Sequence, residues 1–439
     1  MKVLHLSTRD RGGRGGGFDA SYRLHCHLKA ADVDSVMAVL KKRSDDLSVI
    51  DLSSYLTAKD WIRWFFAGLR VRFARRRHRP SRYFVVEKGA YFPVERLTSI
   101  LPFKPDVVVA HWVSHFFTAK MMCQLSAATN APLYWYMMDM APLTGGCHYA
   151  FECKGYTRCC GQCPQLKYGS KTRDISHRQF QEKYRSLSAA DITAVVPASW
   201  LKHQAMASTV FSKRAIKQIE LGMDVDVFKP VDKRQARSAL GLPADRKIVF
   251  FGAHNLHDER KGLRYLKEAL ERLYEMLQGN LALRRSVLIA TAGSQGGDGE
   301  FGFPFEHRHL GFLKGDLKLA SAYQAADVFL NASIEDSGPM MINESILCGT
   351  PVVAFEMGVA LDLVHTGRTG YRAKLKDAGD MAAGLLRLLE MDDESAQAMR
   401  AACRTLGLQL CHPDVQVRSF LELFASHAPV NVVHHDKRG

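Results

Sequence analysis

The sequence has no long hydrophobic run. Its apolar stretches, such as residues 107–110 and 248–251, are far shorter than the roughly 20 residues that cross a bilayer. The opening residues 1–7 are likewise too short for the apolar part of a signal peptide, and charged residues and glycines follow them directly. We therefore expect no membrane-spanning helix and a cytoplasmic protein, which leaves open a peripheral position at the inner face of the membrane.

Cysteine and acidic residues are also few. Ten cysteines in 439 residues do not form the disulfide framework of a small secreted domain, and thiols stay reduced in the cytosol. Lysine and arginine number 60 against 45 aspartates and glutamates, which gives a net charge of +15. This excess favours an anionic partner, such as an anionic lipid, a nucleic acid or a phosphorylated small molecule, without choosing among them.

Strand-like and helix-like segments alternate along the chain. In the front half we expect strands at residues 3–6, 35–40, 106–110 and 133–137 and a helix at 20–31. In the rear half we expect strands at residues 248–251, 287–291, 309–311, 328–331 and 351–355 and helices at 262–277 and 317–326. Such alternation is typical of a parallel sheet with helices on both faces.

The two series divide the chain into two lobes. We expect a first lobe at residues 1–220, a connection at 221–245, a second lobe at 246–410, and a C-terminal helix and tail at 411–439 that packs back on the first lobe. In doubly wound sheets ligands bind outside the carboxyl ends of the strands. The sequence therefore predicts a binding cleft at the junction of the lobes.

The most informative segment follows the strand expected at 328–331. Residues 333–345 predict a tight turn and then a helix, and both would present free backbone N–H groups that bind an anion. Asp336 and Glu344 lie eight positions apart, one at the turn and one about two helical turns further on. A carboxylate accepts two hydrogen bonds, so each acid suits a vicinal diol of a ribose or a sugar. The alternative is a helix cap and a solvated glutamate.

This spacing resembles the E-x7-E signature of glycosyltransferase family 4, with aspartate as the first acid. Residues 224–230, 311–313 and 325–329 resemble further segments of that family and occur in its order. Residues 144–149 and 160–164 resemble a branch of the exopolysaccharide or colanic-acid type, which builds bacterial surface polysaccharides. The resemblance implies a GT-B fold, in which two Rossmann-like lobes face each other across a cleft.

The resemblance also implies an activity and a set of partners. It implies a retaining, metal-independent hexosyltransferase that needs no cofactor and moves a sugar from a UDP-, GDP- or ADP-sugar. The acceptor would be a glycan or a polyprenyl-linked molecule, and no nucleic acid is implied. Glu344 would bind the ribose of the donor, and Asp336 would hold the transferred sugar. Backbone groups of Ser337, Gly338, Pro339 and Met340 would hold the same sugar, and Gly311, Phe312 and Leu313 would meet the nucleobase.

A basic pair, Arg260 and Lys261, precedes the helix expected at 262–277. Negative charge grows on the departing diphosphate during transfer, and fixed cations at a helix start would stabilise it. Relatives often carry an arginine soon after the preceding strand, where this chain has Ala253, so Arg260 is expected to substitute for it. The alternative is a basic pair on the surface.

A glycine-rich turn spans residues 12–17. Its spacing fits the dinucleotide fingerprint, but the second strand ends in Lys41 and Lys42 where an acid is expected, so we exclude nicotinamide binding. The resemblance favours a turn in which Gly16 and Gly17 close on the donor diphosphate. The alternative is a tight turn with no ligand.

Two first-lobe residues are candidates to handle the acceptor hydroxyl. Asp139 follows the strand expected at 133–137 and could orient or deprotonate that group. Relatives often have histidine directly before this aspartate, whereas this chain has Met138. His111, at the end of another strand, is the second candidate, although a lone histidine is more often structural.

Four cysteines, Cys147, Cys153, Cys160 and Cys163, occur within one short segment. Four thiolates could hold one structural zinc, and the last pair has a ligand-like spacing. Buried free thiols or a redox pair are the alternatives.

The stretch from Lys59 to Arg79 combines aromatic and basic residues. Trp61, Trp64, Phe65, Leu69 and Phe73 fall on one helical face, and Arg63, Arg70 and Arg77 lie roughly opposite. This pattern is typical of a helix lying on an anionic membrane surface. The alternative is a helix that packs on the first lobe and exposes a basic face.

Two other functions remain open. A nucleotide-sugar epimerase could use the same fold without an acceptor, and a non-catalytic relative could merely bind glycan or membrane. For the retaining transfer that the resemblance implies, we expect front-face attack, in which the leaving phosphate takes the acceptor proton. This mechanism would explain why no obvious nucleophile is paired with a base.

Overall fold

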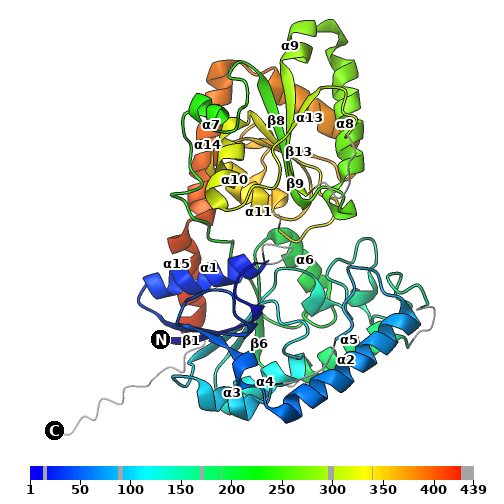
Figure 1. Cartoon of the computed structure of the whole chain (residues 1–439), viewed down its shortest axis with the longest axis vertical. Helices are drawn as coiled ribbons and strands as arrows, with labels where there is room; N and C mark the ends of the chain where they lie inside the picture. Colours follow the sequence, from blue (N-terminus) through cyan, green and yellow to red (C-terminus); the bar gives the residue numbers. More distant parts are fainter. Residues whose placement is uncertain are drawn as a thin grey trace, which may run out of the picture.

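The computed structural model describes residues 1–12, 17–87, 92–168, 173–188, 190–294, 301–338 and 340–426. They form two α/β lobes stacked along the long axis of the molecule (Figure 1). Each lobe has a parallel sheet with helices on both faces. The expected architecture of two Rossmann-like lobes is therefore confirmed.

The first lobe contains a parallel sheet of seven described strands in the order β3-β2-β1-β4-β5-β6-β7. The strands are β1 Lys2–Arg9, β2 Asp34–Lys41, β3 Val49–Asp51, β4 Val107–Ala110, β5 Leu133–Tyr136, β6 Ile192–Val196 and β7 Ile216–Gln218. The helices are α1 Gly17–Ala30, α2 Ala58–His78, α3 Val94–Ile100, α4 Ala119–Thr129, α5 Ile175–Ser188 and α6 Ser199–Ala207. The strand order reverses between β1 and β4, which opens a crevice at their carboxyl ends.

The second lobe contains six described parallel strands in the order β10-β9-β8-β11-β12-β13. They are β8 Lys247–Asn255, β9 Val287–Ser294, β10 Glu306–His309, β11 Val328–Asn331, β12 Val352–Phe355 and β13 Gly370–Ala373. The helices are α7 Lys233–Ala239, α8 Leu263–Met276, α9 Leu281–Ser286, α10 Asp316–Ala325, α11 Met340–Leu347, α12 Ala360–Leu363, α13 Ala378–Leu389 and α14 Asp393–Cys411. Here the order reverses between β8 and β11.

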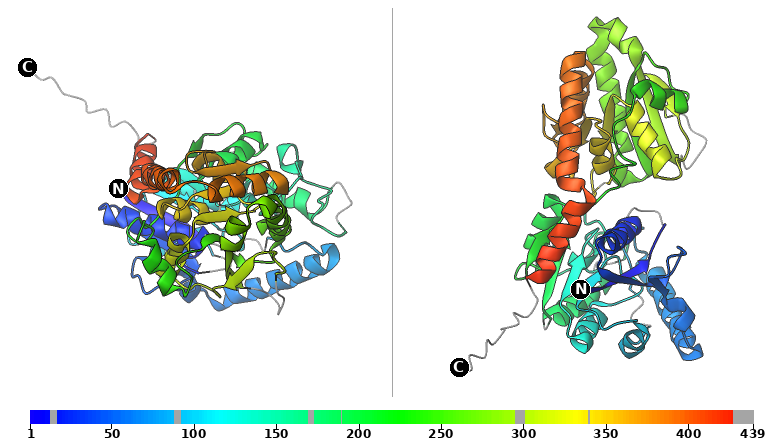
Figure 2. Two further views of the ribbon diagram at one scale, coloured as in Figure 1. Left: turned by 90° about the horizontal axis from the view of Figure 1, so that it is seen from above. Right: turned by 90° about the vertical axis from the view of Figure 1, so that its left-hand side faces the viewer.

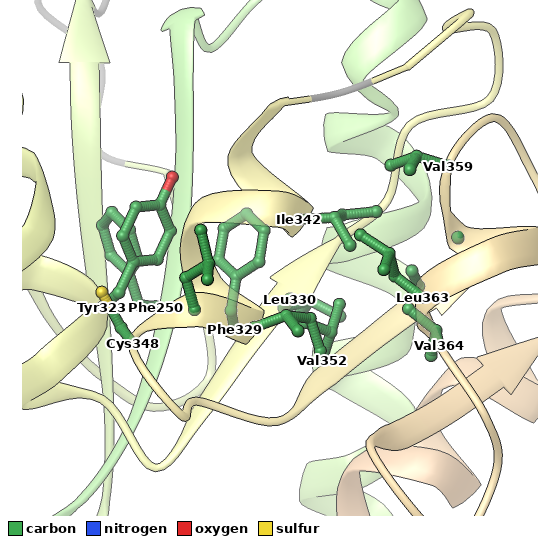
Figure 3. Close-up of a cluster of buried hydrophobic side chains, with 14 of the residues drawn as sticks. Phe250, Tyr323, Phe329, Leu330, Ile342, Cys348, Val352, Val359, Leu363 and Val364 are labelled. Atoms are coloured by element: carbon green, nitrogen blue, oxygen red, sulfur yellow. The ribbon is translucent and has the colours of Figure 1, made fainter. Parts of the chain in front are cut away.

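Aromatic and branched side chains fill the space between this sheet and its helices (Figure 3). Phe250 of β8 meets Tyr323 of α10 edge-to-face, with ring centroids 5.4 Å apart. Ile342 of α11 is fully buried in the same cluster. This packing fixes the start of α11 relative to the strand ends, and the cleft residues described below depend on that position.

Helix α15 (Pro413–Ala425) continues from α14 in the second lobe and runs along the first lobe beside α1 (Figure 2). Its Phe420 ring lies 5.1 Å from the ring of Tyr136 in β5. Gln416 donates hydrogen bonds to the Tyr136 hydroxyl at 3.2 Å and to the Glu220 carbonyl at 3.0 Å. The chain therefore crosses between the lobes twice, and both crossings are anchored on the first lobe.

Two expected elements differ from the structure. The strand predicted at 309–311 is wrong, because β10 ends at His309 and Gly311 turns the chain with φ 71°. Strand β10 is a polar edge strand, so its sequence carried no apolar signal. The segment at 221–245 contains helix α7, whose Arg237 pairs with Asp327 at 2.8 Å.

Candidate active site

A cavity of about 550 Å³ lies between the lobes. From the first lobe, the segments that follow β1, β4 and β5 line it with Gly17, Trp112 and Asp139. From the second lobe, the segments that follow β8 and β11 line it. The two topological switch points therefore face one cavity, whose volume suits a small-molecule ligand.

The basic pair Arg260 and Lys261 lines this cavity on a short 3-10 helix, Glu259–Lys261, which Asp258 caps. The Lys261 Nζ lies 2.6 Å from the Asp336 carboxylate, and an Arg260 guanidinium nitrogen lies 3.7 Å from it. The Arg260 guanidinium also lies 3.8 Å from the centroid of the Tyr149 ring. Its Nε is buried without a hydrogen-bond partner among the described residues.

Gly262 holds the basic pair against the second sheet. Its φ of 69° favours glycine, and a Cβ at this position would lie 1.9 Å from the Ala332 carbonyl oxygen. The Ile334 N–H donates to the Arg260 carbonyl at 2.8 Å in the same region. Any larger residue at 262 would therefore push the basic pair away from the end of β11.

Asp336 has partners in the unliganded protein. Its carboxylate pairs with Lys261 and accepts a hydrogen bond from the Gly338 N–H at 3.3 Å. Burial favours a raised pKa for Asp336, but Lys261 and Arg260 outweigh it and hold the pKa below its ordinary value. The acid therefore fixes the basic pair in place, in addition to the sugar-holding role that the family resemblance implies.

Glu344 lies in α11 at the second-lobe side of the same cavity. The Tyr323 hydroxyl donates to its carboxylate at 2.7 Å. Burial raises the pKa of Glu344 to about 7, against which the Tyr323 hydrogen bond acts. A ligand that donates hydrogen bonds to this carboxylate would favour its ionised form.

The other donor-binding candidates differ in their placement. Gly17, Gly338 and Met340 line the cavity, while the Ser337 hydroxyl donates to the Met138 carbonyl and joins the lobes. The cavity lining does not include Gly311, Phe312 or Leu313. The exposed Phe312 ring nevertheless contacts the ring of His254, a residue that lines the cavity, with ring centroids 5.2 Å apart. Gly16 and Pro339 lie outside the described residues.

Asp139 also lines the cavity, and it is paired with a histidine that the sequence had not assigned a role. The His148 Nδ1 lies 2.5 Å from an Asp139 carboxylate oxygen, which also accepts a hydrogen bond from the Trp112 indole at 3.0 Å. Burial lowers the pKa of His148, but the Asp139 charge outweighs it and the pKa is raised. The His148 Nε2 has no hydrogen-bond partner in the described structure.

The Asp139–His148 pair could not be recognised from spacing alone. His148 belongs to the segment at 144–149, which resembled a polysaccharide branch but carried no assigned chemistry. Its ring stacks on Trp112, with centroids 5.4 Å apart, and both rings line the cavity. The pair therefore presents an imidazole from the first lobe toward the charged groups of the second.

His111 does not reach the cavity, so the structure gives no support to its candidacy. Its ring is buried in the first lobe, where its Nε2 lies 2.8 Å from the His5 Nδ1. Burial, with a further contribution from His25, lowers the pKa of His111 to about 3. A neutral imidazole inside the sheet is a structural residue.

The prediction of a structural zinc is not supported. Among the residues that the structure describes, no group of three or more His, Cys, Asp or Glu side chains is placed to hold a metal ion. The Cys147 and Cys163 sulfur atoms lie 3.9 Å apart, Cys160 accepts from the Gly145 N–H and Cys153 from the Gly155 N–H. Each thiol thus contacts a neighbouring group, and all four cysteines are free of disulfide bonds.

Helix α2 covers the predicted aromatic and basic stretch. Thr57 and Asp60 form a capping box at its start, and its outer surface exposes Trp61, Ile62, Phe65, Phe66, Leu69 and Phe73. The aromatic face is thus directed to the solvent. This differs from the alternative in which the helix packs its aromatic face on the first lobe and exposes only a basic face. No helix in the described part of the chain is long and apolar enough to cross a membrane.

Comparison with known sequences finds relatives of the second lobe. Residues 245–391 match the family of glycosyl transferases group 1. This segment carries Arg260, Lys261, Asp336 and Glu344. D-inositol 3-phosphate glycosyltransferase 2 of Catenulispora acidiphila is 30% identical over 186 residues, which cover 40% of this chain and 42% of the relative. The corresponding enzyme of Mycobacterium tuberculosis is 29% identical over 195 residues, which cover 40% of this chain and 36% of the length of that enzyme. The matches therefore span less than half the length of these curated relatives.

Solved structures agree with the fold over nearly the whole chain. Sucrose-phosphate synthase from Thermosynechococcus elongatus superimposes with a TM-score of 0.63 at 15% identity, covering 97% of this chain and 99% of that one. Anabaena Alr3699/HepE in complex with UDP-glucose gives 0.61 at 15% identity, covering 97% and 100%. At such low identity these similarities establish the two-lobed glycosyltransferase fold and leave the substrates open.

Proposed function

We propose that this protein transfers a hexose from a nucleotide diphosphate sugar to an acceptor held by its first lobe, with retention of the anomeric configuration. The observation that carries the proposal is the convergence of Arg260, Lys261, Asp336 and Glu344 on one inter-lobe cavity. The match of the second lobe to glycosyl transferases group 1 and the UDP-glucose complex of a protein with the same fold support it.

The charges in the cavity suit a sugar diphosphate. Arg260 and Lys261 would bind the diphosphate, which acquires negative charge as its bond to the sugar breaks. Both cations are already held in place by Asp336, so little reorganisation is needed when the donor binds. Glu344 would accept hydrogen bonds from the ribose hydroxyls, and backbone groups of Gly338 and Met340 would hold the sugar.

The placement of the acids supports a front-face reaction. The Asp336 carboxylate is paired with Lys261, and that of Asp139 with His148, so both acids are engaged in ion pairs. In the proposed step the acceptor oxygen bonds to the anomeric carbon on the face from which the diphosphate departs. The acceptor proton passes to the departing phosphate oxygen. The protein then contributes positioning and charge stabilisation.

His148 would serve this reaction from the first lobe. Its Nδ1 is held by Asp139, and its raised pKa favours the imidazolium form. The Nε2–H would then donate to an oxygen of the bound sugar or of the acceptor. This role takes the place of the histidine that relatives carry directly before the aspartate, where this chain has Met138.

For the acceptor we propose a molecule that bears phosphate. The net charge of +15 favours anionic ligands, and the relatives named above are inositol-phosphate glycosyltransferases. The resemblance to the exopolysaccharide branch, together with the exposed aromatic face of α2, supports a lipid-linked acceptor at the inner face of a membrane. Surface polysaccharide synthesis is the corresponding process.

The decisive experiment is a donor screen followed by a transfer assay. UDP-, GDP- and ADP-sugars are compared by thermal stabilisation, and the best donor is incubated with and without D-inositol 3-phosphate or a polyprenyl phosphate. We expect sugar transfer that Glu344→Ala lowers sharply and that the exposed-site control Glu394→Gln leaves unchanged. An isomerised donor in the absence of acceptor would indicate an epimerase, and unchanged turnover in Glu344→Ala would refute the assigned site.

A further inference from the structure

A second large cavity, of about 570 Å³, lies within the first lobe. Residues of α2, α4 and α5 line it, so it is distinct from the cleft between the lobes. Its apolar lining includes Val71 and Ala74 from α2, Val113 and Phe117 after β4, and Ile175 from α5. A cavity of this volume with a partly apolar lining is large enough for a ligand with a hydrocarbon portion.

Basic side chains also line this cavity. Arg70 and Arg77 come from α2, Lys120 from α4 and Arg178 from α5, and Arg70 and Arg77 are solvent-exposed. Two acids, Glu87 and Glu182, contribute to the lining as well. Cations therefore exceed acids, which favours a ligand with an anionic group attached to its apolar portion.

The cavity meets the exposed apolar face of α2 at Phe73. This side chain lines the cavity although it is 66% exposed. Leu69 and Phe66 continue the exposed face along the same helix. A hydrocarbon chain could therefore pass from a lipid surface into the cavity along a continuous apolar path.

The cavity and the inter-lobe cleft share a thin wall. Val85 lines the cleft and its neighbour Val86 lines the cavity, and Trp112 and Val113 are divided in the same way. Gly146 lines the cavity two residues before His148, which lines the cleft. The cavity and the cleft are therefore neighbouring but separate spaces.

We infer that this cavity binds the hydrocarbon chain of a long-chain lipid phosphate, and that such a lipid phosphate is the acceptor or its carrier. Binding of the lipid follows from the cavity itself. Its role as acceptor rests on the proposed function and names the acceptor's chemical class. Arg70 and Arg77 would bind the phosphate at the exposed mouth of the cavity.

The test uses the full-length protein and farnesyl phosphate as the probe, with inorganic phosphate and farnesol as partial ligands. Isothermal titration should show saturable binding of farnesyl phosphate and weaker binding of both partial ligands. The double variant Ala67→Phe/Ala74→Phe fills the cavity from α2 and should weaken binding at least about tenfold, because the rings occupy the volume of several methylenes. Ala58→Phe adds the same ring at an exposed position of α2 and should leave binding unchanged.

Binding of UDP-glucose, measured in parallel, separates this inference from the proposed function. Unchanged farnesyl phosphate affinity in the double variant, or inorganic phosphate binding as tightly as farnesyl phosphate, would overturn the lipid site. If the double variant does not fold, a diazirine derivative of farnesyl phosphate is crosslinked to the unaltered protein. Labelling of peptides that contain Val71 or Phe117 supports the site, and labelling confined to other peptides overturns it.

Discussion

Replacement of Lys261 by methionine tests the proposed reaction centre most directly. The side chain keeps a similar length but loses the charge that lies 2.6 Å from Asp336. Asp336 retains Arg260 at 3.7 Å and the Gly338 N–H, so it is not left without partners, and we expect a loss of about 1–3 kcal/mol in the free energy of unfolding. Loss of one donor to a charge that grows in the transition state costs about 10²–10³ in kcat.

The assay is steady-state transfer with the donor identified by the screen, together with donor affinity by titration. Lys261→Met should lower kcat far more than it raises KM, because the charge acts mainly on the departing diphosphate. Lys261→Arg should recover part of kcat, and Lys267→Met, further along α8, should resemble the unaltered protein. A kcat within about twofold of the unaltered protein, at unchanged folding, would refute the role of the basic pair.

Four other predictions concern the cleft and α2. Burial raises the pKa of Glu344 to about 7, and in the proposed site the donor ribose binds its carboxylate. Donor affinity should therefore rise with pH through 7, and titration below pH 7 should show proton release that Glu344→Gln abolishes; a flat profile would contradict the assignment. The pKa of Glu344 is about 4.5 in the unfolded chain and about 7 in the folded protein, so ionisation of this carboxyl destabilises the folded state as the pH rises through this range. Glu344→Gln should therefore raise Tm more at pH 8 than at pH 5. Gly262→Ala should lower the free energy of unfolding by more than about 1 kcal/mol, and with it Tm and the transfer rate, because the new Cβ would clash with the Ala332 carbonyl. Gly279→Ala is the control, since nothing lies within 4 Å of a Cβ there. Equal Tm values for the two variants would exclude the steric argument. Co-sedimentation with anionic liposomes should fall when Trp61, Trp64 and Phe65 of α2 are changed to serine, and equal binding would reject the membrane role of α2.

Much of the fold could be predicted because its signal is local. Strands such as β8 and β11 are short apolar runs bounded by helices with a regular apolar spacing, and a parallel sheet follows from that alternation. Strand β10 escaped prediction because an edge strand of Glu306–His309 composition has no apolar pattern to detect. The exposed aromatic face of α2 was left open, since the same helical spacing suits both a buried and a solvent-facing stripe.

The sequence by itself determined which second-lobe candidates share an element: Asp336 and Glu344 lie on one turn and helix, and Arg260 and Lys261 lie just before another helix. Only the tertiary structure joined these groups, and it alone paired His148 with Asp139 and enclosed the first-lobe cavity. Contacts such as that of Ser337 with Met138, 199 positions away in the chain, depend on how two sheets are packed together. Local spacing decides which residues share one element, whereas the packing of distant elements decides which side chains meet.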